Sequence, residues 1–444
     1  DEFSAAAGVY DIGGDLNNSG EIYGLTDIGL AAGVYGAVAD TINYGLIAAR
    51  ADNGTAVGIL REDSGGVVNN ASGVILAEGM QATGVFIGSY AHVDSKGDED
   101  LVSPTVQNDG LIGAVSLDPD APSIGIEAVG QEAFALNFVN SGVIIADFAI
   151  YSAVDSLTGN PYTTENVVNQ NGGLIEGIIY LGEGHDSVTN KGTIEGVVAL
   201  GGGDDTMRDA GGRLVGIADL GFGADRFVGG AGAETVLGNR DNDNLNGGGG
   251  KDILLGGYGD DTLNGGASSD SLYGEWGNDV ILGGAGDKID GGAGDDRIVL
   301  SDFGGFAGIE GGAGFDTLVL PGASRILDLK LAIADGTLNG IDSLALGKNL
   351  GLVVRPADVA ELSDAENLTV QADASNHVYL VGGWTEGGEK VVGGQTYRTF
   401  DAGSDQLLVQ LGATVTINHR APAVAVGFDP APAALPVALD PSLF

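Results

Sequence analysis

Glycine and aspartate recur at fixed spacing in the middle of the chain, as in "GGYGDDTLN", which begins at Gly256. Turns of this kind start every nine residues, at Gly229, Gly238, Gly247, Gly256, Gly265, Gly274 and Gly283. A glycine turn can direct bare backbone carbonyls at a cation, and the aspartate that follows adds a charged oxygen. Calcium takes about six to eight such oxygen ligands. The spacing therefore predicts a row of calcium sites.

Two nonapeptides make one coil of 18 residues, so this period assigns each aspartate to one of two opposite edges. One edge is predicted to carry Asp186, Asp205, Asp225, Asp243, Asp261, Asp279, Asp296 and Asp316, and the other Asp252, Asp270 and Asp287. The turn glycines predicted to add ligands are Gly202, Gly248, Gly250, Gly257, Gly259, Gly266, Gly284, Gly286, Gly292 and Gly294. With each ion shared by equivalent turns of adjacent coils, the two edges would hold roughly ten calcium ions.

The acidic residues could instead form a solvated face, which is the usual fate of a run of charge. A solvated face requires neither glycine at fixed offsets nor an aliphatic residue at every ninth position. This chain has both, and its aliphatic positions are Leu254, Leu263, Leu272 and Ile281. We expect these four side chains to line a thin core, and we favour calcium binding over the solvated face.

Several turns depart from the pattern and are expected to bind calcium less securely. Glu234 replaces the aspartate of its turn, which we expect to be empty, and Ser268 replaces the second turn glycine of "GGASSDSLY". The turn "GNRDNDNLN" lacks two glycines, and "GGAGDKID" is one residue short.

Contiguous copies such as "GGYGDDTLN", "GGASSDSLY", "GEWGNDVIL" and "GGGGKDILL" resemble the repeats-in-toxin (RTX) family, whose nonapeptide builds a calcium-dependent parallel β-roll. The resemblance extends from Leu181 to Leu320. It implies a Gram-negative origin, type I export, and folding that waits for extracellular calcium. We therefore expect the protein outside the cell or on the cell surface.

The first half carries a softer repeat of Asn, Gly and aliphatic residues, as in "NYGLIA", "NDGLIGA" and "NSGVIIA". The glycines Gly8, Gly33, Gly58 and Gly84 recur at steps of 25, 25 and 26 residues, which is a solenoid period. Each phrase predicts a short strand that cannot bury its inner face alone, so successive coils must stack. The predicted fold is all-β: a right-handed parallel β-helix over residues 1–180 that continues into an RTX calcium β-roll over 181–320.

Beyond Pro321 the nine-residue spacing stops, and residues 321–420 resemble a module that follows RTX blocks in secreted bacterial surface proteins. The features that carry this resemblance are "LSDAENLTV", "VYLVGGW" and "TYRTF". We expect a small β-rich capping domain that hides the last layer of the solenoid core, with Trp384 and Tyr397 buried in it. Residues 421–444 are rich in Pro, Ala and Val and predict an extended tail.

The composition limits the classes of partner. The chain has 444 residues, a net charge of −44 and no cysteine, so it would repel nucleic acid and attract divalent cations. It has no apolar stretch approaching the roughly 18 residues of a membrane span. We therefore expect a folded protein without disulfides that binds calcium and does not bind nucleic acid.

Three functional classes fit a calcium-stabilised solenoid. We favour a structural protein that assembles with copies of itself into a surface layer or filament, with the tail 421–444 as connector. The second interpretation is an adhesin or carbohydrate-binding surface protein whose partner is a cell-surface polysaccharide. A polysaccharide lyase or epimerase is a distant third, because such chemistry needs basic groups and residues 1–181 contain only Arg50, Arg61 and Lys96. The four histidines are isolated in sequence, and we expect no enzyme.

Overall fold

The computed structural model describes residues 5–10, 15–35, 40–61, 66–89, 105–130, 135–154, 164–303, 305–333, 338–363, 367–418, 420–422 and 425–428. It divides the chain into two compact units, Asp1–Arg240 and Asp241–Phe444. The division falls inside the segment predicted as the β-roll. The predicted boundaries at residues 180 and 320 follow changes in composition, and they stay predictions.

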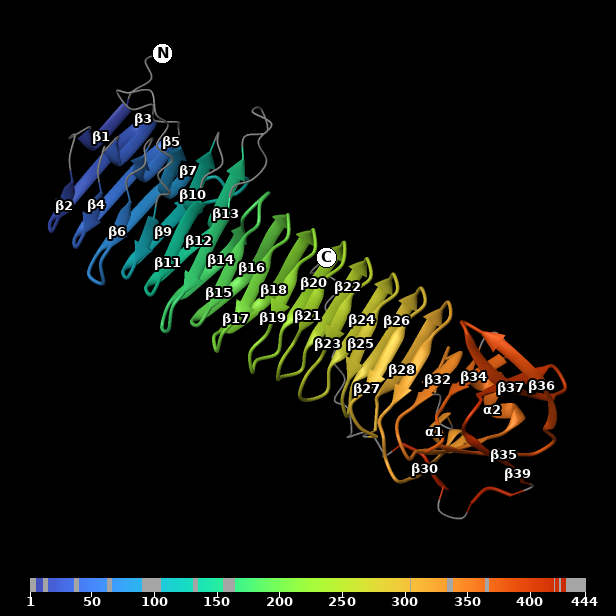
Figure 1. The fold of residues 1–444 in the computed structure, drawn as a ribbon. Helices are drawn as coiled ribbons and strands as arrows, with labels where there is room; N and C mark the ends of the chain where they lie inside the picture. The colour runs from blue at the N-terminus through green and yellow to red at the C-terminus, as the bar shows by residue number, and fades with distance from the viewer. Residues whose placement is uncertain are drawn as a thin grey trace, which may run out of the picture. The chain divides into compact units, whose positions relative to one another are not determined.

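Parallel strands stack through the first unit (Figure 1). Sheet A of this unit contains, in spatial order, β1 (Ala5–Tyr10), β3 (Glu21–Tyr35), β5 (Leu46–Arg61), β7 (Val74–Ser89), β10 (Ile124–Gly130), β12 (Val143–Val154), β14 (Leu174–Tyr180), β16 (Thr193–Gly202), β18 (Arg213–Phe222) and β20 (Thr235–Arg240). The short strand β9 (Leu111–Ser116) pairs in parallel with both β7 and β12. Each strand of the sheet thus belongs to one coil.

Sheet B of the first unit faces sheet A across the coil. It contains β2 (Leu16–Asn18), β4 (Thr41–Asn43), β6 (Val67–Asn69), β8 (Thr105–Asn108), β11 (Ala135–Asn140), β13 (Thr164–Asn169), β15 (Ser187–Asn190), β17 (Thr206–Asp209) and β19 (Arg226–Val228). The register places Val34 between Val9 and Ile59, one residue after the repeating glycines. The predicted parallel β-helix is confirmed.

The same corner repeats from coil to coil in the first unit and is held by an internal row of asparagines, here called the asparagine ladder. Its members are Asn18, Asn43, Asn69, Asn108, Asn140, Asn169 and Asn190. Each side-chain amide donates to the amide oxygen of the next coil at 2.8 or 2.9 Å. Asn190 ends the row by donating to Asp209 Oδ1 at 3.1 Å. The asparagines of the soft repeat therefore stack as an internal, structural ladder.

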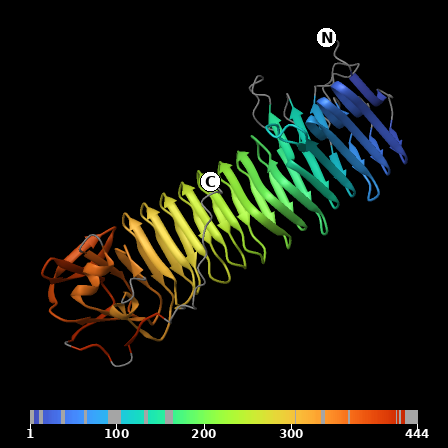
Figure 2. The ribbon, with the colours of Figure 1, turned by 180° about the vertical axis from the view of Figure 1, so that it is seen from behind.

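The second unit begins with shorter strands of the same kind, drawn in yellow and orange in Figure 2. Its sheet A contains β22 (Ile253–Tyr258), β24 (Ser271–Trp276), β26 (Lys288–Ala293), β28 (Gly308–Ala313) and β31 (Leu338–Asn339). Its sheet B begins with β21 (Asn244–Asn246), β23 (Thr262–Asn264), β25 (Val280–Gly283), β27 (Arg297–Leu300) and β29 (Thr317–Leu320). The predicted core positions Leu254, Leu263, Leu272 and Ile281 are all 0% exposed, which confirms the thin core.

The segment predicted as a cap continues sheet B of the second unit without a break. Parallel pairing runs from β29 to β32 (Ser343–Leu346), β34 (Asn367–Gln371) and β38 (Asp405–Gln410). The strands β37 (Gln395–Ala402) and β36 (Thr385–Val392) then add antiparallel to this edge. A third sheet contains β39 (Thr414–Asn418), β35 (His377–Val381), β33 (Gly351–Val354), β30 (Ile326–Asp328) and β40 (Ala425–Val426), in that order.

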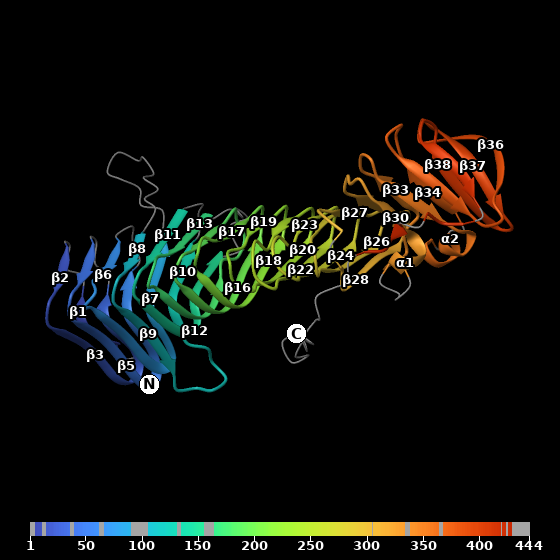
Figure 3. The same ribbon diagram turned by 90° about the horizontal axis from the view of Figure 1, so that it is seen from below.

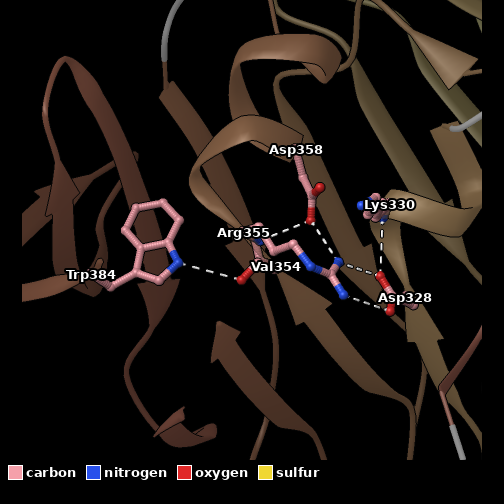
Figure 4. A network of polar contacts seen from close by, with 6 residues as sticks. All are labelled: Asp328, Lys330, Val354, Arg355, Asp358 and Trp384. Carbon is pink, nitrogen blue, oxygen red and sulfur yellow. Dashed lines mark hydrogen bonds and ion pairs between the residues drawn. The ribbon is translucent and has the colours of Figure 1, made fainter. Parts of the chain in front are cut away.

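Two short helices follow strands of this third sheet, α1 (Leu329–Ile333) and α2 (Pro356–Leu362). The first contacts β30 and β33 of the third sheet, and the second contacts β34 and β38 of sheet B. The Arg355 guanidinium binds both carboxylate oxygens of Asp328 and also contacts Asp358, which ties the start of α2 to the end of β30 (Figure 4). Trp384 and Tyr397 are 6% and 4% exposed, as expected of aromatics buried in this region. Trp384 Nε1 donates to the Val354 carbonyl at 3.4 Å.

The beginning of the tail packs on its own chain, which corrects the prediction that all of 421–444 reaches a neighbouring subunit. β40 pairs in parallel with β30, joining Ile326 to Ala425 and Leu327 to Val426. The ring of Phe428 lies edge-on to Phe306, with 5.6 Å between the ring centres. Val426 stays 39% exposed, whereas Phe428 is half-buried beside the rings of Phe303 and Phe306. Residues 429–444 lie outside the described part of the chain.

Replacing Asn108 with alanine should destabilise the first unit. Asn108 is 1% exposed, accepts from Asn69 Nδ2 and donates to Asn140 Oδ1, so the substitution removes one hydrogen bond from each of two buried amides. We expect the free energy of unfolding to fall by about 1–3 kcal/mol. The matched control is Asn53→Ala, because Asn53 is exposed on β5. Urea unfolding followed by circular dichroism measures both; an equal effect of the two substitutions would contradict a structural role for the ladder.

Candidate calcium site

The structure brings the aspartates of the first predicted edge together, coil upon coil. In the first unit the backbone N–H of Asp186 donates to Asp205 Oδ1 at 2.6 Å, and that of Asp205 to Asp225 Oδ1 at 2.7 Å. In the second unit the same bond links Asp243, Asp261, Asp279, Asp296 and Asp316 in turn, at 2.7 to 2.9 Å. One oxygen of each accepting carboxyl is therefore used to hold the neighbouring coil.

The second predicted edge has the same construction. The backbone N–H of Asp252 donates to Asp270 Oδ1, and that of Asp270 donates to Asp287 Oδ1, both at 2.9 Å. These aspartates are 0 to 2% exposed. The one-residue deletion in "GGAGDKID" changes the end of this row, because Asp287 Oδ2 already accepts the N–H of Gly284 at 2.6 Å. Asp287 thus has less capacity left for a cation than Asp270.

The remaining carboxylate oxygen decides whether these residues fit calcium. The Oδ2 atoms of Asp261, Asp270, Asp279 and Asp296 are buried and have no hydrogen-bond partner among the described residues. Each lies over the first glycine of its own turn: a Cβ on Gly256, Gly265, Gly274 or Gly291 would come within 2.2 to 2.5 Å of it. Burying an ionised oxygen without a partner is unfavourable in free energy. A divalent cation, which prefers oxygen ligands, fits this requirement.

The turn glycines leave the close approach between coils that such a site needs. Gly277 has φ of 134°, and a Cβ on it would lie 1.7 Å from the Gly259 carbonyl oxygen of the preceding coil. The carbonyls of Gly202 and Gly248 each accept a backbone hydrogen bond from an adjacent coil, at 2.6 and 2.7 Å. Carbonyl oxygens have a second lone pair, so this bond leaves one site for a cation. The assignment of the turn glycines as ligands stays a prediction.

Most departures from the repeat keep the same backbone path. Ser268 and Glu275 adopt φ of 108° and 76°, the positive values that glycine takes at the matching positions of other turns. Asn239 and Asp241 in "GNRDNDNLN" do so at 76° and 71°. The missing glycines therefore strain these turns without changing their course. Glu234 is 2% exposed, so it is buried at its turn like the aspartates it replaces.

Burial raises the pKa of the ladder carboxyls. The pKa rises from 3.8 to about 7 for Asp205, Asp261 and Asp296, and to about 6 for Asp270 and Asp279. Desolvation is the main cause in every case, opposed by the backbone hydrogen bond that each carboxyl accepts. Without a cation, part of the ladder would thus be protonated near neutral pH.

The ladder extends beyond the predicted residues at both ends. In the first unit the N–H of Glu165 donates to Asp186 Oδ1 at 2.7 Å, and Glu165 is 0% exposed. In the second unit the N–H of Asp316 donates to Asp342 Oδ2 at 3.1 Å, and Ser363 Oγ donates to Asp342 Oδ1. The signal for Asp342 was present, since "GIDSLAL" repeats the form of "GFDTLVL". The spacing of 26 residues in place of about 18 hides it.

Other polar residues lie outside this arrangement. His185 is exposed, and its Nδ1 accepts the Asp204 N–H at 2.8 Å. His377 stacks on Tyr379, while His92 and His419 lie outside the described residues. No group of three or more His, Cys, Asp or Glu side chains forms a compact metal centre in the described part of the chain. Calcium here would depend on backbone carbonyls and paired aspartates.

Replacing Asp261 with asparagine should weaken calcium binding by about tenfold or more, because one buried charge at a shared site is lost. Asp260→Asn is the matched control, since Asp260 is adjacent in sequence but exposed. Glu234→Gln should have a smaller effect than Asp261→Asn. Calorimetric titration with calcium measures all three variants. Equal affinities for the Asp260 and Asp261 variants would rule out the buried aspartates as ligands.

In calcium-free buffer the fold should become less stable as pH rises. The folded state keeps protons on Asp261, Asp279 and Asp296 up to pKa values of about 7, 6 and 7, whereas an unfolded aspartate releases its proton near 3.8. The folded state therefore binds more protons between these values, and the free energy of unfolding falls through that window. We expect a lower melting temperature at pH 8 than at about pH 5.

Thermal melts followed by circular dichroism measure this dependence. The general repulsion of an acidic chain acts in the same direction, so Asp261→Asn serves as the comparison: it should make the pH dependence shallower. Identical pH dependence in the variant and the parent protein would show that the buried ladder does not cause it.

Comparison with known families supports this geometry. The family model for the RTX calcium-binding nonapeptide repeat matches residues 220–254, 255–287 and 286–302. No curated protein sequence and no solved structure matches the chain. The matched segments contain Asp261, Asp270, Asp279 and Asp296, whose buried Oδ2 atoms have no hydrogen-bond partner among the described residues. Residues 220–302 therefore belong to the family of RTX calcium-binding nonapeptide repeats.

Proposed function

We propose that this protein is an extracellular, calcium-dependent structural protein that assembles with copies of itself into a surface layer or filament. Its RTX repeats make it a calcium-binding protein. We propose in addition that the protein binds this calcium outside the cell and that the calcium-bound form assembles with copies of itself.

The observation that carries the proposal is the row of buried carboxylates that joins coil to coil through Oδ1 and leaves Oδ2 without a partner at Asp261, Asp279 and Asp296. A cation at these positions would neutralise the charge that otherwise opposes stacking. Extracellular modules bind calcium at millimolar levels, so the repeats would become rigid after export. Calcium would thus act as a folding signal that is specific to the outside of the cell.

The rigidity of stacked coils suits a structural subunit better than it suits an enzyme. Both ladders make every coil depend on its neighbours, as in other solenoids, so the stacked coils resist local unfolding. The connector between subunits is assigned to residues 429–444, since residues 425–428 pack on their own chain. Proline and aliphatic residues alternate in 429–444, which suits an extended segment laid along another surface.

The proposed location is the exterior of a Gram-negative bacterium. RTX repeat proteins are typically secreted, and the acidic composition suits a medium rich in divalent cations. Among the described residues, no helix combines the length and apolarity needed to cross a membrane.

We propose no catalytic role. The RTX repeat is a binding and folding element, and Arg50, a basic residue of the first unit, is exposed and paired with Asp52 and Glu78. Carbohydrate binding is the second candidate function, and it is favoured by a pocket on the first unit that Gln81, Phe86 and Glu127 help to line.

Self-assembly should require both calcium and residues 429–444. We expect light scattering and electron microscopy to show ordered polymers in millimolar calcium and none after chelation, while circular dichroism in chelator shows loss of β signal from the repeats. A chain ending at Phe428 should fold with calcium and stay monomeric. The proposal fails if the truncated chain assembles like the full chain, or if the full chain stays monomeric in calcium.

A further inference from the structure

A pocket of about 360 Å³ lies on the outer face of sheet A in the first unit. Its floor comes from the adjacent strands β3, β5, β7 and β10, which lie side by side in Figure 3. A volume of this size is typical of small-molecule sites. The outer face of a solenoid sheet is normally open, so something must wall this pocket.

The wall is the connection 117–123 between β9 and β10, which contributes Ala121 and Pro122 to the lining. Both ends of this connection are fixed. The Leu117 N–H donates to the Gly79 carbonyl at 2.7 Å. At the other end, the N–H and Oγ of Ser123 both donate to Asp147 Oδ2, at 2.9 and 2.8 Å. The pocket is therefore built by anchored backbone.

Four polar side chains lie across three successive coils of the floor. Thr55 on β5 donates to Gln81 on β7 at 3.3 Å, and Thr83 on β7 donates to Glu127 on β10 at 3.0 Å. Within the described part of the chain, Glu127 is the one charged residue that lines the pocket. Burial raises its pKa, opposed by the hydrogen bond from Thr83. Hydroxyl, amide and carboxyl groups thus repeat at the spacing between coils, about 4.8 Å.

Apolar side chains lie on both sides of these polar groups. The register sets Leu60 beside Phe86 and Phe86 beside Glu127 in one row across the strands. Leu30, Val57 and Ile124 complete the apolar lining. Phe86 is half-buried, so part of its ring faces the pocket. A ligand that fits must combine apolar faces with several hydrogen-bonding groups.

The negative charge of the pocket and of the whole chain disfavours anionic ligands. Among the described residues the lining has a carboxyl and no basic group, and the chain carries a net charge of −44, so an anion would be repelled. A simple cation would satisfy Glu127 but leave Thr55, Gln81 and the apolar surface unused. A neutral sugar ring offers hydroxyl groups at its edge and C–H groups on its faces. This combination matches the whole lining.

We propose that this pocket binds a neutral saccharide unit, with Glu127, Thr83 and Gln81 contacting its hydroxyls and Phe86 its apolar face. The proposal does not depend on self-assembly, and it requires only the first unit to be folded. It gives the surface protein a specific contact with neutral glycans.

Saturation-transfer NMR on the full chain in calcium tests the proposal with methyl glucoside, methyl galactoside, methyl mannoside and N-acetylglucosamine, alongside glucuronic acid and glucosamine. At least one neutral sugar should receive saturation and glucuronic acid none. Glu127→Gln, which keeps the shape of the side chain, and Gln81→Ala, at an exposed side chain, should each raise the dissociation constant by about fivefold. Glu176→Gln is the control, because Glu176 is exposed on β14 outside the pocket.

Circular dichroism of each variant shows whether it folds, and Gln81→Ala keeps the test valid if the buried site does not tolerate Glu127→Gln. The proposal is overturned if no neutral sugar binds, if glucosamine alone binds, or if the folded pocket variants bind like the Glu176 variant.

Discussion

The fold of the repeats depends on how a carboxylate can be buried. The ladder aspartates Asp261, Asp270, Asp279 and Asp296 are 0 to 2% exposed. Each has one oxygen held by the backbone of the adjacent coil, as Asp261 Oδ1 is by the Asp243 N–H. The second oxygen faces a glycine in its own turn and has no partner at Asp261, Asp270, Asp279 and Asp296. Burying such an oxygen in ionised form is unfavourable by itself. The backbone therefore builds a stack that is completed by a cation or by protons.

The asparagine ladder also buries a row of polar side chains between stacked coils, but its amide groups are uncharged. Asn43 and Asn69 each donate and accept across one coil step, so an asparagine row satisfies itself. In both ladders a side-chain oxygen occupies space above a glycine: a Cβ on Gly73 would lie 2.2 Å from Asn69 Oδ1, much as one on Gly274 would lie 2.2 Å from Asp279 Oδ2. The two ladders differ in their titratable groups. An asparagine side chain has none in this pH range, whereas burial raises the pKa of the ladder carboxyls, to about 7 for Asp261.

Much of this was predictable because side-chain chemistry and spacing act locally in a solenoid. The nine-residue spacing predicted the inward Leu263 and the pairing of Asp261 with Asp279, and the period of about 25 residues predicted the stacked coils of the first half. Glu165 and Asp342 were missed because inserted residues break the spacing on which the prediction depended. The pairing of β40 with β30 joins residues about 100 positions apart, and the pocket beside Glu127 depends on the path of a connection. Neither feature has a periodic signal in the sequence.

Calcium in these corners can be located directly. A crystal structure of the protein grown in calcium, with anomalous differences measured at long X-ray wavelength, would place every ion independently of any spectroscopic effect. Ions should lie beside the Oδ2 atoms of Asp261, Asp279 and Asp296, between successive coils. Ions bound only at exposed carboxylates such as Asp260 and Asp295, with the buried oxygens left without a cation, would contradict the central claim that the buried aspartate ladder is the calcium site.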